Sequence, residues 1–87
     1  MNSHLAEPFF RHWHGLPREI QTLARKNYRL WRDDSGHPSL HFKELKAGLW
    51  SVRIGLHYRV LGRKRGDTIH WFWVGPHAEY DAQIRRL

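Results

Sequence analysis

Three arginines in the second half of the chain have the spacing of a phosphate-binding surface. Arg53, Arg59 and Arg63 lie in two segments in which apolar and basic residues alternate. Because side chains of a strand alternate between two faces, we expect these arginines to share one face of neighbouring strands. A guanidinium presents a planar fork of donors to phosphate oxygens, so this face is a candidate phosphate-binding surface; a solvated face that only maintains solubility is the alternative. Adjoining segments add Lys43, Lys46 and Arg65.

His77 and Tyr80 are candidate proton-transfer groups, because they follow directly after the last apolar segment. The end of a strand is a place where side chains reach into a cleft, and both groups can exchange a proton. The alternative is that His77 bonds to the backbone and Tyr80 closes the core with its hydroxyl in water. Glu44 is a further candidate acid or base, although such a carboxylate is more often simply exposed.

No metal site is expected, although the chain has eight histidines. His12 and His14 are two residues apart, which places them on different faces of a helix. His37 and His41 are four apart, but Pro38 between them interrupts helical geometry. The chain has no cysteine, which excludes thiolate ligands, a thiol nucleophile and disulfides.

The composition indicates one small basic domain, residues 1–87. Lys and Arg number 15 against 8 acidic residues, and the resulting net charge of +7 favours a polyanionic partner. The chain contains no run of 18 apolar residues, and charged residues and histidines are scattered through its first twenty positions. We therefore expect neither a membrane span nor a secretory signal, and a cytoplasmic protein.

Two helices are expected in the first half of the chain. Residues 17–33 place apolar side chains along one stripe of a 3.6-residue period. Residues 6–13 hold aromatic residues at near-helical spacing, which predicts a short first helix in a hairpin with the second. Residues 33–38 are rich in turn formers and end this half, and the extended segment after Pro38 is expected to be too short for a strand. The apolar stripe consists of Ile20, Leu23, Ala24, Leu30 and Trp31.

The second half has the two-residue period of strands. Residues 49–55 and 57–63 each place apolar groups on one face and arginine on the other, and residues 68–74 are apolar on both faces, as in a covered strand. Residues 62–67 are expected to form a turn-rich link, and residues 77–87 a short tail or a last helical turn. The pattern predicts an α+β fold, with an N-terminal helical hairpin on a three-stranded antiparallel sheet and arginines on the helix-free face.

Four stretches carry a family resemblance through their order and spacing. They are Leu16-Pro17 at a helix start, residues 37–43, residues 50–60, and residues 71–81 with their Gly-x-His-x-x-Tyr ending. Together they resemble the RelE/ParE superfamily of toxins from type II toxin-antitoxin systems. The resemblance implies a small α+β fold. Members usually begin with a strand, and because only residues 1–5 precede the first helix here, that edge strand is expected to be short or absent.

The resemblance also implies a function. RelE-like members cut messenger RNA in the ribosomal A site without a metal ion, ParE-like members inhibit DNA gyrase, and an acidic cognate antitoxin holds both inactive. A metal-independent endoribonuclease that acts on ribosome-bound mRNA, inhibits translation and needs no cofactor is therefore the leading hypothesis. A gyrase inhibitor and a plain nucleic-acid-binding module are the alternatives.

The resemblance assigns roles to residues whose positions match. Arg59 matches the arginine that follows an aromatic residue on the second strand, and Arg53 matches a cationic position on the first, so both are implied to stabilise the scissile phosphate. His77 stands where members have arginine or histidine and is implied as acid or base. Tyr80 matches a late tyrosine that stacks on a base or orients the nucleotide. Glu44 stands near a glutamate that acts as base in some relatives.

Overall fold

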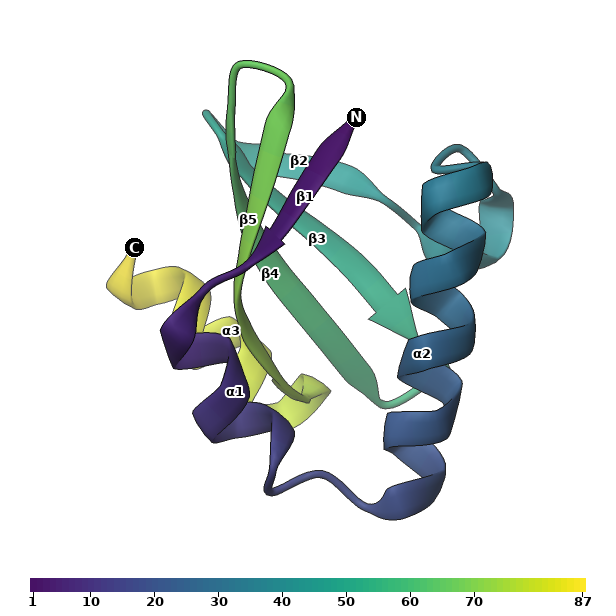
Figure 1. Ribbon diagram of the computed structural model, residues 1–87. Helices are drawn as coiled ribbons and strands as arrows, with labels where there is room; N and C mark the ends of the chain where they lie inside the picture. The colour runs from purple at the N-terminus through teal and green to yellow at the C-terminus, as the bar shows by residue number, and fades with distance from the viewer.

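The fold is built on a mixed sheet of five strands in the order β1-β5-β4-β3-β2 (Figure 1). The structure is a computed structural model that describes residues 1–87. β1 runs parallel to β5, and all other neighbours are antiparallel. The strands are β1 (Asn2–Leu5), β2 (Lys43–Lys46), β3 (Leu49–Ile54), β4 (Tyr58–Arg65) and β5 (Thr68–Pro76).

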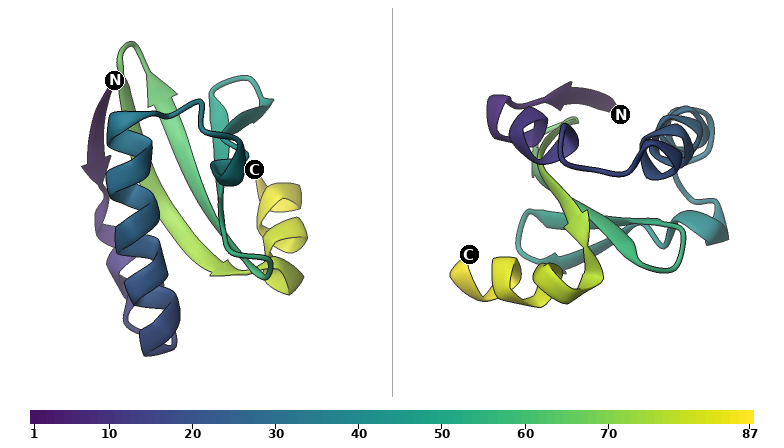
Figure 2. Two further views of the ribbon diagram at one scale, coloured as in Figure 1. Left: turned by 90° about the vertical axis from the view of Figure 1, so that its right-hand side faces the viewer. Right: turned by 90° about the horizontal axis from the view of Figure 1, so that it is seen from below.

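Helices cover both faces of the sheet, so the molecule has three layers (Figure 2). α1 (Glu7–Trp13) and α2 (Arg18–Asp33) lie on one face, and a short 3-10 helix, η1 (Pro38–Leu40), leads from α2 towards β2. α3 (His77–Arg86) lies on the opposite face. None of these helices has the length and apolar character needed to cross a lipid bilayer.

The larger core fills the space between the sheet and the α1-α2 hairpin. α2 contributes the apolar stripe predicted from its sequence, of which Ala24 and Trp31 are buried. β3 contributes Val52 and Ile54, while Arg53 between them lines a cleft on the opposite face. Burial stabilises each large apolar side chain by about 1.5–3 kcal/mol. The structure thus confirms the 3.6-residue period of α2 and the alternation along β3.

A smaller core lies between the sheet and α3, on the face for which the sequence predicted no helix. The pairing of β4 with β5 shifts between Leu61 and Gly62, and this bulge lets both Phe72 and Trp73 pack on the α3 side. The expectation that the last strand is covered on both faces is confirmed. The predicted arginines do lie on this face, but the expectation that no helix covers it is wrong. The buried residues of this second core are Leu49, Leu61, Trp73 and Tyr80.

Other expectations are also corrected. The sheet has five strands rather than three, because residues 43–46 pair with β3 and residues 2–5 pair with β5. The first edge strand is therefore present and short, and its parallel pairing makes the sheet mixed. β4 continues to Arg65, so the link to β5 is a tight turn. Residues 77–86 form a ten-residue helix rather than a single turn.

Substitution of Gly62 is expected to destabilise the protein, because β4 passes close to the larger core, between the sheet and the α1-α2 hairpin, at this position. A Cβ at this position would lie 2.6 Å from Trp71 Cε3 and 2.9 Å from Ile69 Cγ1. Gly62→Ala is therefore expected to lower the free energy of unfolding by about 1–3 kcal/mol through overpacking, as measured by urea denaturation. Gly36→Ala is the matched control, since its Cβ meets only an Asp34 side-chain oxygen at 3.7 Å. Equal unfolding midpoints for the two variants would contradict this packing.

Candidate functional site

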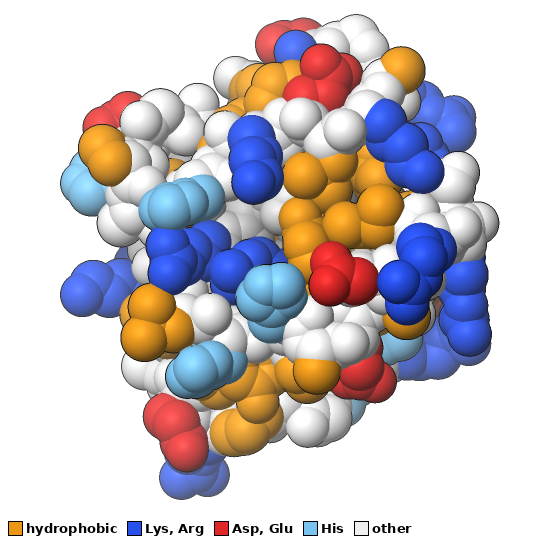
Figure 3. Space-filling model, turned by 180° about the vertical axis from the view of Figure 1, so that it is seen from behind, with side chains coloured by type: hydrophobic (Ala, Val, Ile, Leu, Met, Phe, Trp, Pro, Cys, Tyr) orange, Lys and Arg blue, Asp and Glu red, His pale blue; other side chains and the backbone are white.

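Seven side chains line a cleft of about 250 Å³ beside the start of α3. They come from β2, β3, β4, α3 and the segment between η1 and β2. Three are Lys or Arg, two are His and none is Asp or Glu, so the cleft is cationic. Figure 3 shows Lys, Arg and His side chains gathered on this face of the molecule. The lining residues are His41, Lys43, Ser51, Arg53, Arg59, His77 and Tyr80.

Two arginines stand directly opposite each other in the cleft, Arg53 on β3 and Arg59 on β4. Carbonyl groups near the β3–β4 turn hold both guanidinium groups. Nε of Arg53 donates to the Gly55 carbonyl at 2.9 Å, and Nη1 of Arg59 donates to the Tyr58 carbonyl at 2.8 Å. The Asn27 side chain of α2 donates to the carbonyl of Arg53 at 3.2 Å. Both guanidinium groups are therefore tied to the turn, and the backbone of Arg53 is also tied to α2.

The arginine pair places like charges together, with no carboxylate in the cleft to neutralise them. Burial lowers the pKa of Arg59, and the charge of Arg53 lowers it further, while Tyr80 acts in the opposite direction. Like charges directly opposite each other on paired strands destabilise a sheet. An anion bound between the two guanidinium groups offsets both effects, so the cleft is suited to a phosphate group.

α3 brings His77 and Tyr80 to the cleft. The backbone N–H of His77 donates to the His57 carbonyl at 2.6 Å, which fixes the start of the helix on the β3–β4 turn. The exposed His77 ring meets the Tyr80 ring edge to face, with centroids 5.6 Å apart. The Tyr80 ring is buried in the second core, and its hydroxyl donates to Ser51 Oγ at 3.1 Å instead of lying in water. The Arg59 guanidinium carbon lies 6.0 Å from the same ring.

A family profile described as a ParE-like toxin domain matches residues 18–82. This span includes α2, four of the five strands and all seven cleft residues. The chain belongs to the ParE-like toxin family.

Solved toxin structures share the fold of this ParE-like toxin. A chain of the RelB-RelE antitoxin-toxin complex from Methanococcus jannaschii matches with a TM-score of 0.73 and 20% identity, over 91% of this chain and 96% of that chain. The YoeB/ParE toxin from Agrobacterium tumefaciens matches with a TM-score of 0.66 and 18% identity, over 88% and 99%. The isolated E. coli RelE toxin matches with a TM-score of 0.64 and 12% identity, over 99% and 98%. These similarities establish the α+β fold, and no curated protein sequence matches the chain.

Four residues that the sequence placed at the site lie outside the cleft of this toxin, and the first two, Glu44 and Lys46, are on β2. Glu44 follows Lys43 by one residue and so faces the other side of β2, where its carboxylate accepts a hydrogen bond from the Gly48 N–H at 3.0 Å. Lys46 Nζ donates to the Ile84 carbonyl near the end of α3 at 3.3 Å. The Glu44 carboxylate thus has a structural partner in a turn and no contact with the cleft.

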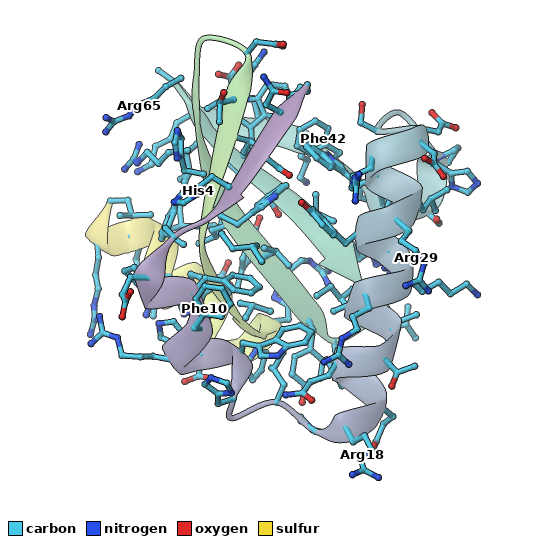
Figure 4. The ribbon with its side chains drawn as sticks, in the orientation of Figure 1. His4, Phe10, Arg18, Arg29, Phe42 and Arg65 are labelled. Carbon is cyan, nitrogen blue, oxygen red and sulfur yellow. The ribbon has the colours of Figure 1, made fainter.

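Arg63 and Arg65 lie farther along β4 than the arginine pair, and they line a separate depression with His70 and Phe72. Figure 4 shows Arg65 pointing away from the sheet near the β4–β5 turn. The arginines that the sequence placed on one surface therefore form two separate groups, one in the cleft and one beside the hairpin end.

His41 and Ser51 are cleft residues that the sequence did not identify. As a metal ligand His41 would need His37, but the His37 side chain caps η1, and no group of three ligating side chains forms in the structure. The spacing held a usable indication, since His41 is two residues before Lys43, with Phe42 between them packed against the first core. Alternation thus places His41 and Lys43 on one side.

The arginine pair is expected to lower the stability of the free protein while it favours the binding of phosphate. Arg53→Gln removes the like charge opposite Arg59 and is expected to raise the free energy of unfolding by about 0.2–1 kcal/mol in urea at low salt. Since arginine stays charged throughout the working pH range, the gain is expected at every pH. The variant is also expected to lose most of the stabilisation that inorganic phosphate gives the wild type. Arg29→Gln, at an exposed position of α2 (Figure 4), is the control; lower stability with unchanged phosphate response in Arg53→Gln would contradict this account.

Proposed function

We propose that this toxin is an endoribonuclease that cuts ribosome-bound mRNA and so inhibits translation. The observation that carries this proposal is a cleft in which two arginines without a carboxylate partner lie with a histidine at the start of α3. Cleavage of RNA by its own 2′-hydroxyl needs cations at the phosphate, a base for the hydroxyl and an acid for the departing 5′ oxygen. The cleft holds groups of these kinds, so the reaction is proposed to proceed without a metal ion or cofactor.

The cleft residues divide into phosphate-binding and proton-transfer groups. Arg53 and Arg59 hold the scissile phosphate and stabilise the charge that grows on its oxygens, and their carbonyl partners keep them oriented before the substrate arrives. Lys43 adds a third cation at the rim. His77 gives a proton to the departing 5′ oxygen. Tyr80 orients His77 and Arg59 through its ring, since burial leaves the ring little free face on which a base could stack.

Cations outside the cleft are proposed to bind flanking RNA. Arg63 and Arg65 share their depression with Phe72, and arginine with an aromatic ring is a common combination for single-stranded RNA. Lys46 extends the cationic surface along β2. Glu44 receives no catalytic role, because it faces away from the cleft.

The choice of ribosome-bound mRNA as substrate rests on the resemblance to RelE toxins. The second candidate function is inhibition of DNA gyrase, which the ParE-like description of the matching family favours. The two functions differ in what they need from His77. A protein that inhibits by binding alone has no use for a proton-transfer group, whereas a nuclease does.

His77→Ala and Arg59→Ala are expected to abolish growth arrest and to reduce mRNA cleavage about 10²-fold or more, because they remove the acid and a phosphate cation. The measurement is brief induction in cells followed by mapping of new mRNA 5′ ends in translated regions. His57→Ala and Arg29→Ala are matched controls, since both side chains are exposed and lie outside the cleft.

The outcomes separate the candidate functions. New ends that vanish in both cleft variants support the nuclease. Growth arrest with intact transcripts, retained in His77→Ala, moves the target to gyrase. Toxicity and new ends retained in both folded variants would refute the assignment of the site.

An acidic cognate antitoxin is the partner that we propose for this toxin. The M. jannaschii relative is part of an antitoxin-toxin complex, and a net charge of +7 on 87 residues attracts an acidic chain. Co-expression with the neighbouring reading frame is expected to yield a complex whose association slows about tenfold or more between low and high salt. A neighbour that neither binds nor restores growth would argue against this partner.

A further inference from the structure

His41 lies at hydrogen-bond distance from one arginine of the cleft. Its Nε2 atom is 3.0 Å from Nη1 of Arg53. Arginine has only donors and keeps its proton in proteins, so Nε2 of His41 is the acceptor in this bond. The His41 ring is therefore neutral in this arrangement, with its proton on Nδ1 and a lone pair on the cleft side.

The backbone holds His41 in a conformation that residues other than glycine seldom adopt. Its φ and ψ are 47° and 42°, in the left-handed region. The residue ends η1, where its N–H donates to the Pro38 carbonyl at 3.3 Å. The next residue, Phe42, packs against Trp31 of the first core, with ring centroids 5.7 Å apart, and Figure 4 shows it between α2 and the sheet. Strained residues of this kind concentrate at functional sites.

We propose that His41 is the general base of the RNA cleavage reaction. This assignment rests on the proposed function and supplies the group that the proposed function leaves open. Nε2 of His41 takes the proton of the 2′-hydroxyl as O2′ forms a bond to phosphorus. The bond from phosphorus to the 5′ oxygen breaks, and protonated His77 gives its proton to that oxygen. The products are a 2′,3′-cyclic phosphate and a 5′-hydroxyl end, and exchange with water then resets both histidines.

Arg53 connects the base to the phosphate. In the free protein, Nη1 of Arg53 donates a hydrogen bond to the lone pair of His41 Nε2. A bound phosphate is a charged and therefore stronger acceptor for the guanidinium, so substrate binding releases Nε2 for the 2′-hydroxyl. The base is thus exposed when the scissile group is in place.

No carboxylate competes with His41 for the role of base. Glu44, the base candidate from the sequence, is bonded to a turn on the other side of β2. The charged and titratable groups that line the cleft with His41 are Lys43 from β2, Arg53 from β3, Arg59 from β4, and His77 and Tyr80 from α3.

Two substitutions separate the base from the backbone at this position. Asn tolerates the left-handed conformation but takes no proton at neutral pH, and Gly fits the conformation without a side chain. On ribosomes programmed with a short mRNA, we expect His41→Asn and His41→Gly to cut about 10²–10⁴-fold more slowly than the wild type with an unchanged unfolding midpoint. Added imidazole is expected to restore part of the rate of His41→Gly. His14→Asn, at an exposed position outside the cleft, is the control.

A sulfur atom in place of the 5′ oxygen at the mapped cleavage site distinguishes the base from the acid. Sulfur departs without a proton, so this mRNA is expected to restore cleavage by His77→Ala and to leave His41→Asn slow. Undiminished rates in both His41 variants, or rescue of His41→Asn by sulfur, would overturn the assignment. If the wild type itself does not cut, the proposed function fails and the base with it, a result distinguishable from the others by the wild-type reaction alone.

Discussion

Two guanidinium groups held opposite each other on adjacent strands are the constraint on which the rest of the structure depends. The register of β3 and β4 sets Arg53 against Arg59, and carbonyls beside the turn keep both groups in place. Gly55 makes that turn possible with a φ of 60°. Such a pair weakens the sheet locally, so the remaining stability must come from packing elsewhere. The same repulsion makes the cleft receptive to a phosphate.

The two cores serve different purposes around this pair. The core beneath α1 and α2 buries a large aromatic cluster, in which Trp31 and Trp71 meet edge to face at 5.4 Å. The core beneath α3 is smaller, but it fixes the Tyr80 ring between the sheet and His77. Stability thus comes mainly from one face of the sheet, and positioning of the candidate site comes mainly from the other.

Periodicity in the sequence predicts the arginine face and the helical hairpin, because each depends on local alternation alone. It does not predict the bulge at Gly62, since an extra residue in one strand leaves no trace in composition. The extra residue of the bulge lies in β5, so Arg63 stays on the same face of β4 as Arg59, with Leu61 between them, and the two arginines line separate depressions. The sequence did not predict β2 and left β1 short or absent. Each has only four residues, and so short a segment becomes a strand only when it pairs with a neighbouring strand.

In the candidate site, too, local alternation predicts some residues and misses others. Alternation brings Arg53, Arg59 and Lys43 to the cleft, and the strand end brings His77 and Tyr80. Glu44 fails to reach it by one residue, which in a strand reverses the direction of the side chain. The two-residue spacing from Lys43 places His41 on the cleft side, but the left-handed backbone conformation at the end of η1 could not be predicted from the spacing.

The proposed cleavage reaction depends on attack by the 2′-hydroxyl of the RNA. The most direct test is a programmed mRNA that carries a single 2′-deoxy nucleotide immediately before the mapped cleavage site, incubated with purified toxin and ribosomes. We expect cleavage at that site to disappear, while cutting at unmodified sites continues and leaves 2′,3′-cyclic phosphate ends. Cleavage at the deoxy site at the wild-type rate would contradict it.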